Sequence, residues 1–342
     1  MLEYLYLSGG LLMGWSLGAN DSANIFGTGV ASGLIKYRTA IVITAFFVLL
    51  GALIEGGKCL ETLSGLSTLS PVQSFFCILA AALTMTLLTL YAIPASSSQA
   101  IVGAIMGFAL YRGESDFSAL LKIIICWVAT PFGACFFSVI LHALLRRALV
   151  EKMRSVPALN ALYFWGVMLT GCYGAYALGA NNVANVTGPY VIAHLLSPVQ
   201  ATVVGGVSIA LGVLTFSKRT MMTVGKGIIP LDPFAALISV LSEALTLHIF
   251  TQIGVPVSSS QAIVGAVIGI GIVRDHRTLN VRILRKIGYG WISTPVVSGF
   301  LAWLFALGLG VAWYEVIGNV LELLLDVLEN MADLVEGIPM LW

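Results

Sequence analysis

The chain has 342 residues, of which 58% are hydrophobic and only 10% are charged. Soluble domains carry roughly a quarter charged residues, so this composition excludes an ordinary water-soluble protein and indicates a membrane protein. The net charge of +1 also argues against a nucleic-acid partner.

Ten apolar segments follow one another along the chain and fall into two sets of five. Several of them lie in stretches without Lys, Arg, Asp or Glu that reach the roughly 20 residues needed to span a bilayer. The first set is expected at residues 4–33, 39–54, 73–93, 97–111 and 119–145, and the second at 161–193, 199–216, 234–252, 259–273 and 283–312. The fourth segment of each set has 15 residues, so it is expected to be a half-helix that either continues through irregular backbone or is re-entrant.

The last stretch of the chain has a different pattern. It contains six acidic residues and no basic one, and their spacing places them on one helical face. We expect an amphipathic acidic helix with a packing role or a place on the outer face. The predicted organisation is a first transmembrane repeat at 1–153, a second at 154–312 and this helix at 313–342.

Two polar motifs occur twice in the chain. Residues 94–107 and 256–269 are identical at eleven of fourteen positions, and residues 18–24 and 179–185 at five of seven. The two copies are separated by 162 and 161 residues, so a unit of about 160 residues is duplicated. A polar, glycine-rich motif that occurs twice within apolar segments is typical of transporters built from structural repeats.

The basic residues predict how the two repeats are oriented. Five elements form an odd number, so the second repeat is expected to enter the membrane inverted relative to the first. If the N-terminus lies outside, the inner connections are those at 34–39, 92–96, 146–157, 218–233 and 274–286, and 14 of the 17 basic residues fall in them. This bias follows the positive-inside rule. It predicts an all-α polytopic membrane protein with inverted-topology repeats, broken or half-helices at the midplane, and both termini on the outer side.

The polar motifs need partners at membrane depth, because an unpaired polar group in hydrocarbon costs several kcal/mol. Pro94 and Pro256 precede serine runs that lead into apolar segments, which indicates helix starts whose N–H groups and hydroxyls face an anion. Gly103, Gly107, Gly265 and Gly269 fit a helix-contact pattern instead, and we expect them to serve packing.

The motif segments contain no Lys or Arg. The charge of an anion bound there would therefore be met by helix ends, hydroxyl and amide donors, and a cation that arrives with it. The side chain of Asp21 and nearby oxygens could hold a hard cation such as Na⁺. An anion and a cation in one pocket without basic side chains indicate symport.

At these motifs the chain resembles the inorganic phosphate transporter (PiT) family, whose mark is G-A-N-D-x-A-N in both halves together with P-x-S-[ST]-[ST]. The resemblance covers nearly the whole chain and implies a phosphate symporter coupled to Na⁺ or H⁺. It implies substrate binding by Asn24, Thr28, Ser96, Ser97, Ser98, Gln99, Asn181, Asn185, Ser258, Ser259, Ser260 and Gln261. It implies a cation site, with Na⁺ near Asp21, formed by Asp21, Asn20 and Asn182. Position 182 departs from the pattern, because Asn stands where the family has Asp.

The expected partners are inorganic phosphate, Na⁺ or H⁺, and the lipid bilayer of the cell membrane. No cofactor is expected, and the sequence leaves open whether the chain forms a homodimer. A sulfate permease of the same family is the first alternative, since nothing in the motifs separates two tetrahedral oxyanions.

Two other functional classes fit the sequence less well. An anion channel is disfavoured by the paired broken helices. A serine hydrolase would need the G-x-S-x-G match at residues 14–18 to lie on a strand-turn-helix, and the second repeat lacks its serine. Glu243 and His248 are further polar residues within a span, but their repeat-one counterparts are Ala81 and Thr86. For these two we expect buried hydrogen bonding.

Overall fold

The structure is a computed structural model that describes residues 2–64, 66, 68–90, 95–113, 117–227, 232–274 and 281–310. Within these residues the chain forms helices and no strand. The first repeat contains α1 (Leu2–Ala31), α2 (Tyr37–Glu55), α4 (Pro71–Leu90), α5 (Ser97–Arg112) and α6 (Phe117–Leu145). The second contains α7 (Val156–Ile192), α8 (Pro198–Phe216), α10 (Pro233–Ile253), α11 (Ser259–Arg274) and α12 (Val281–Gly310). The ten expected elements are confirmed, with ends that differ by five residues or fewer.

Short helical pieces join these elements. A 3₁₀ turn at Gly56–Cys59 and α3 (Leu60–Ser64) follow α2, and a π-helical turn at Arg146–Val150 continues α6. The helix α9 (Lys218–Gly227) lies where the sequence indicated a connection. It packs against α1 and buries Met221, so tertiary contact stabilises a helix that its polar sequence did not predict.

Local signals explain where several helices begin and end. Ser197 and Gln200 form a capping box at the start of α8, with Pro198 in the first turn. The Asp232 side chain caps α10 by accepting a hydrogen bond from the Ala235 N–H. Gly113 and Gly254 end α5 and α10 in the left-handed conformation that glycine adopts without strain.

The short fourth element turns back beside the third. Arg112, the last residue of α5, donates to the Thr68 carbonyl just before α4, with Nη1 and O 2.7 Å apart. In the second repeat Arg274 at the end of α11 pairs with Asp232 at the start of α10. Each α4–α5 or α10–α11 pair is therefore a re-entrant hairpin, and each repeat keeps an odd number of crossings. The connection at 92–96, expected at the inner surface, instead ends with Ala95 and Ser96 buried.

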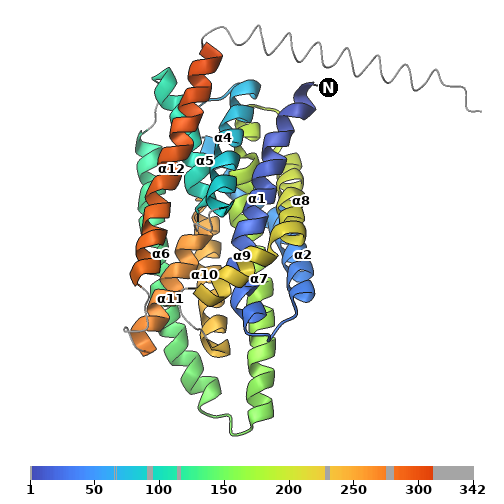
Figure 1. The fold of residues 1–342 in the computed structure, drawn as a ribbon, viewed down its shortest axis with the longest axis vertical. Helices are drawn as coiled ribbons and strands as arrows, with labels where there is room; N and C mark the ends of the chain where they lie inside the picture. Colours follow the sequence, from blue (N-terminus) through green and yellow to red (C-terminus); the bar gives the residue numbers. More distant parts are fainter. Residues whose placement is uncertain are drawn as a thin grey trace, which may run out of the picture.

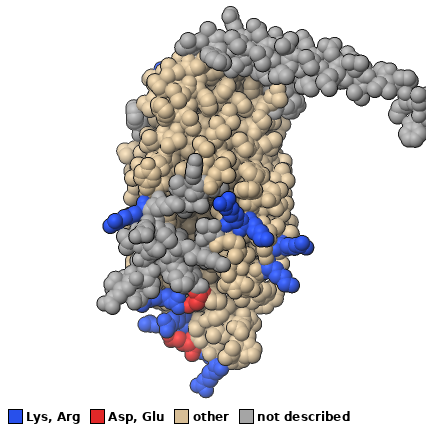
Figure 2. Space-filling model, viewed as in Figure 1, with Lys and Arg blue, Asp and Glu red and all other residues tan. Residues whose placement is uncertain are grey.

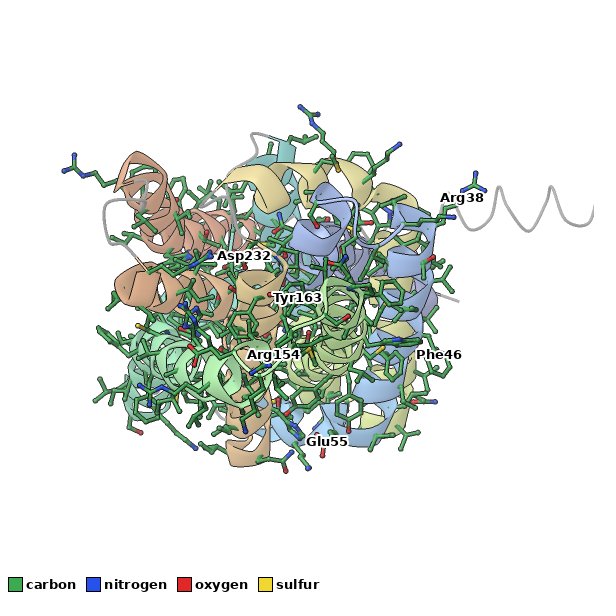
Figure 3. All side chains as sticks on the ribbon, turned by 90° about the horizontal axis from the view of Figure 1, so that it is seen from below. Arg38, Phe46, Glu55, Arg154, Tyr163 and Asp232 are labelled. Carbon is green, nitrogen blue, oxygen red and sulfur yellow. The ribbon has the colours of Figure 1, made fainter. Side chains whose placement is uncertain are left out.

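The two repeats are inverted relative to each other. In Figure 1, α1 runs downward from the N-terminus, whereas α7 runs upward from the α6–α7 turn at the lower end. Most of the Lys and Arg side chains visible in Figure 2 lie in the lower half of the molecule. Seen from this end in Figure 3, Arg38 lies at the rim, and Arg154 and Asp232 lie nearer the middle. That the lower end faces the cytoplasm stays a prediction.

The helices of each repeat pack mainly on helices of the other repeat. The half-helix α5 packs on α12, and its counterpart α11 packs on α6; α1 packs on α8, and α2 on α7. Small residues permit this close approach: a Cβ at Gly103 would meet the Pro295 carbonyl, and one at Gly265 would meet the Pro131 carbonyl. The expected packing role of these glycines is therefore confirmed.

The outer surface fits a bilayer. Six helices within the described residues are long and apolar enough to cross a membrane, among them the spans at Leu120–Val150 and Ile287–Leu309. Phe132 on α6 and Ile292 on α12 are both 72% exposed, as expected for side chains that contact lipid. The expected acidic helix at 313–342 and the residue Pro94 lie outside the described residues.

We predict that Gly103→Ala destabilises the protein, because its Cβ would meet the Pro295 backbone and a helix must move apart. Overpacking of this kind costs about 1–3 kcal/mol. The change is measured as a lower melting temperature of the purified protein in detergent. Gly288→Ala on α12 is the control, since nothing lies within 4 Å of its Cβ position. Equal melting temperatures for both variants would contradict the predicted contact.

A labelling experiment tests the orientation. In a variant without the five native cysteines, Lys152→Cys is expected to be protected and Asp116→Cys to be modified by a membrane-impermeant thiol reagent on intact cells. The reverse pattern would place the N-terminus inside, and modification of both would contradict the inverted arrangement.

Candidate functional site

The half-helices α5 and α11 both begin inside the protein with a capped first turn. Ser96 Oγ accepts a hydrogen bond from the Gln99 N–H at 3.3 Å, and Ser258 Oγ accepts one from the Gln261 N–H at 3.2 Å. The capping hydroxyls also pair with Ser98 at 3.2 Å and with Ser260 at 2.9 Å. The hydroxyls in the middle of each run are therefore left to contact polar side chains of α1 and α7.

These middle hydroxyls meet at Asp21. Ser259 Oγ donates to Asp21 Oδ2 at 2.9 Å, and Ser97 Oγ lies 3.4 Å from the same oxygen. Asp21 is only 1% exposed, and its Oδ1 has no hydrogen-bond partner within the described residues. One carboxylate on α1 thus connects the half-helix starts of both repeats and keeps one oxygen free.

Three asparagines extend this cluster along α1 and α7. Ser97 Oγ donates to Asn182 Oδ1 at 3.2 Å, and Asn185 Nδ2 donates to the same oxygen at 2.9 Å. Asn24 Nδ2 lies 3.4 Å from Ser259 Oγ. Asn182 thereby occupies the place that Asp21 has in the other repeat, but as a neutral amide it brings no charge.

Asn181 lies in the wall of the site. Its Nδ2 donates to Thr251 Oγ1 at 3.0 Å, and its Oδ1 accepts from the Val257 N–H at 2.9 Å. This side chain therefore fixes the backbone that leads into α11. Asn20, its counterpart in the first repeat, is buried as well. Thr28 is half-buried one turn beyond Asn24, and the hydrogen bonds of the Asp21 cluster do not include it.

A groove of about 580 Å³ lies between α6 and α12; its lining is mostly apolar and includes the exposed side chains of Phe132 and Ile292, and it reaches the two glutamines that follow the serine runs. Gln99 and Gln261 line it together with equivalent residues of both repeats, such as Trp127 and Trp291. The Oε1 atoms of both glutamines and Oδ1 of Asn185 have no hydrogen-bond partner among the described residues. Buried polar atoms are normally satisfied, so this group of unpartnered amide and carboxylate oxygens indicates a binding site.

The electrostatics of the core are acidic. Among the described residues, the buried carboxylate side chains belong to Asp21 and Glu243, and no Lys or Arg is buried. No group of three or more His, Cys, Asp or Glu that could hold a metal ion occurs there. An anion would meet hydroxyls, amides and the N–H groups of two helix starts, and a hard cation would meet oxygen atoms.

The structure corrects one expectation and supports another. Both carboxylate oxygens of Glu243 lack a hydrogen-bond partner within the described part of the chain, so the expected buried hydrogen bonding is wrong for this residue. His248 does form such contacts, with Nδ1 2.7 Å from the Tyr173 hydroxyl and Nε2 3.0 Å from Glu55 Oε2. Ser16 of the G-x-S-x-G match lies within α1, where its hydroxyl pairs with that of Thr86 at 2.9 Å.

An all-helical membrane protein with two inverted repeats, whose half-helices meet at one buried polar cluster, is a secondary transporter by architecture. The chain belongs to the phosphate transporter family, whose model matches residues 17–165 and 155–302. It is therefore a transporter and not an enzyme.

Relatives and a solved structure agree with this family. The "Putative phosphate permease PF1020" of Pyrococcus furiosus is 26% identical, over 86% of this chain and 92% of its own. The "Sulfate permease CysP" of Bacillus subtilis is 30% identical, over 86% of this chain and 84% of its own. A solved structure described as "The sodium-dependent phosphate transporter" has the same fold, with a TM-score of 0.83, 23% identity, and coverage of 91% of this chain and 100% of the other.

The geometry predicts that the two serine runs act as an equivalent pair. Ser97→Ala and Ser259→Ala are each expected to weaken apparent substrate affinity about tenfold to a hundredfold, because each removes a hydrogen bond worth about 1.5–3 kcal/mol. The measurement is the substrate concentration that gives half-maximal uptake in proteoliposomes. The control is Ser242→Ala, whose hydroxyl is buried but bonds its own helix at Ile238 O. An effect from one run alone would place the anion in one repeat.

Proposed function

We propose that the chain imports inorganic phosphate across the cell membrane by symport with Na⁺. The observation that carries this proposal is the Asp21 carboxylate, held by one serine from each repeat in a core where no described Lys or Arg is buried. A multiply charged anion cannot enter such a core alone, because the attraction of helix ends is modest and Asp21 repels it. A cation bound at Asp21 removes that repulsion and supplies the missing positive charge.

The arrangement of donors and acceptors favours phosphate as the anion. The hydroxyls of Ser97 and Ser259 and the starts of α5 and α11 offer donors to the oxygens of a tetrahedral oxyanion. The unpartnered acceptors, with Asp21 Oδ1 foremost, suit an anion that also carries a proton of its own. Hydrogen phosphate brings that proton at neutral pH, whereas sulfate does not.

Sodium is proposed as the coupling cation on chemical grounds. Carboxylate, hydroxyl and amide oxygens are ligands for hard cations, and the candidate residues Asp21, Asn20 and Asn182 offer such atoms. The similar solved structure is described as sodium-dependent. The inverted repeats support alternating access, in which the two interlocked halves rock around the central cluster.

Sulfate transport is the second candidate, favoured by the 30% identity to the sulfate permease. Uptake by proteoliposomes separates the candidates. Radiolabelled phosphate and sulfate are offered under an imposed Na⁺ gradient, an imposed H⁺ gradient or neither. Phosphate accumulation that requires inward Na⁺ supports the proposal; sulfate accumulation, or phosphate uptake driven by H⁺ alone, contradicts it.

We predict that Asp21→Asn nearly abolishes coupled uptake and leaves the protein folded. The substitution keeps the shape of the side chain and removes the charge that holds the cation. Uptake in proteoliposomes and the elution volume of the purified protein in detergent measure the two effects. Uptake at the original rate with the original Na⁺ dependence would count against the cation role of Asp21.

A further inference from the structure

Glu243 on α10 is a buried acid for which the proposed site has no use. It is 1% exposed, and both of its oxygens lack a hydrogen-bond partner among the described residues. An ionised carboxylate without a partner is costly at membrane depth, so it must be neutralised by a proton or by a bound cation. Intramembrane acids of this kind mark ion pathways more often than they serve packing.

The neighbours of Glu243 place it next to the Asp21 cluster. The Cβ position of Gly174 on α7 lies 3.1 Å from Val240 Cγ1 and 3.5 Å from Ile25 Cγ2, so α1, α7 and α10 meet there. The helices α1 and α10 run in opposite directions. The end of α10 lies at the end of α2, where Gln252 contacts Glu55, and α2 returns toward the end of the molecule at which α1 begins. Ser22 precedes Ile25 by one turn on α1, and Glu243 follows Val240 by one turn on α10. Because the two helices are antiparallel, Ser22 and Glu243 lie at the same level.

The other oxygens at this level are also unpartnered. Ser22 is fully buried, and its hydroxyl has no hydrogen-bond partner within the described residues. Asp21, the adjacent residue, keeps Oδ1 free and is an electrostatic neighbour of Glu243. Among the described residues, four unpartnered oxygen atoms from three side chains thus belong to neighbouring levels of α1 and α10, two helices that pack against each other. Two carboxylates near each other repel unless a proton or a cation neutralises one of them, and oxygen atoms are the ligands that hard cations require.

We propose that Glu243 is a ligand of the coupling cation, together with Ser22 and the free oxygen of Asp21. This inference rests on the proposed cation symport and adds a residue from the second repeat to its cation site. Each repeat then contributes one acid from a non-equivalent position, because the counterpart of Asp21 in the second repeat is the amide Asn182, and the counterpart of Glu243 in the first repeat is Ala81. The symmetric backbone would in this way hold one asymmetric cation site.

Binding of radiolabelled Na⁺ to the purified protein, without phosphate, tests this directly. Glu243→Gln is expected to weaken Na⁺ binding about tenfold or more, the equivalent of about 1.4 kcal/mol, because the ligand loses its charge. Ser22→Ala is expected to weaken it less, since a neutral hydroxyl is lost. The control is Ser239→Ala, one turn away on α10, whose hydroxyl bonds Ala235 O and which should bind Na⁺ as the original protein does.

Transport assays then separate a cation ligand from a structural residue. In proteoliposomes, Glu243→Gln is expected to raise the Na⁺ concentration for half-maximal uptake and to leave phosphate affinity at saturating Na⁺ nearly unchanged. Glu243→Asp, which restores the charge, should recover part of the Na⁺ affinity.

Unchanged Na⁺ binding in Glu243→Gln would overturn the inference. So would a pH dependence of uptake that changes in this variant while the Na⁺ dependence does not. If Glu243→Gln does not fold, the test falls to Ser22→Ala, and unchanged Na⁺ binding in that variant would overturn the inference. Failure of the proposed function would give a different result. In that case the original protein binds Na⁺ through Glu243 but does not accumulate phosphate.

Discussion

The structure depends on one constraint: polar atoms inside a bilayer must find partners within the protein. Asp21 is subject to this constraint, because it is a carboxylate buried in the middle of α1. The Ser259 hydroxyl, at the start of one half-helix, donates a hydrogen bond to it, and the Ser97 hydroxyl, at the start of the other, lies 3.4 Å from the same oxygen. Both starts must therefore reach the centre of the protein, which requires two re-entrant hairpins, one from each side of the membrane.

The exchange of helices between the repeats follows from these hairpins. A half-helix that begins in the middle of the protein is buried over most of its length, and α5 is buried from Ser97 to Ala109. It packs on α12 of the other repeat, where Gly103 lies against the Pro295 carbonyl. The equivalent contact joins α11 to α6. Neither half of the site can therefore form without the other repeat, and motion of one repeat changes the site that both share.

The backbone is symmetric, but its chemistry is not. Asp21 and Asn182 occupy equivalent positions, and the hydroxyls of both middle serines lie within 3.4 Å of the same Asp21 oxygen. A polar network of Glu55, His248 and Tyr173 joins the repeats at one end. The equivalent positions at the other end carry different residues, such as Thr86 in place of His248. A symmetric scaffold can present the site to both sides of a membrane, while asymmetric side chains decide which ions bind there.

The sequence by itself determined the helical spans, their inverted duplication and the residues of the polar motifs, because hydropathy, basic-residue bias and repetition are properties of the linear chain. It did not determine that α5 turns back beside α4, since a segment of 15 residues fits a half-helix of either direction. It assigned Asn181 to the substrate, whereas the structure places this side chain against Thr251 and Val257. It set Glu243 aside for want of a counterpart, and only the structure shows that this acid is buried without a hydrogen-bond partner among the described residues, on a helix that packs against α1. Contacts between distant segments decide these points, and a single sequence does not encode them in any local pattern.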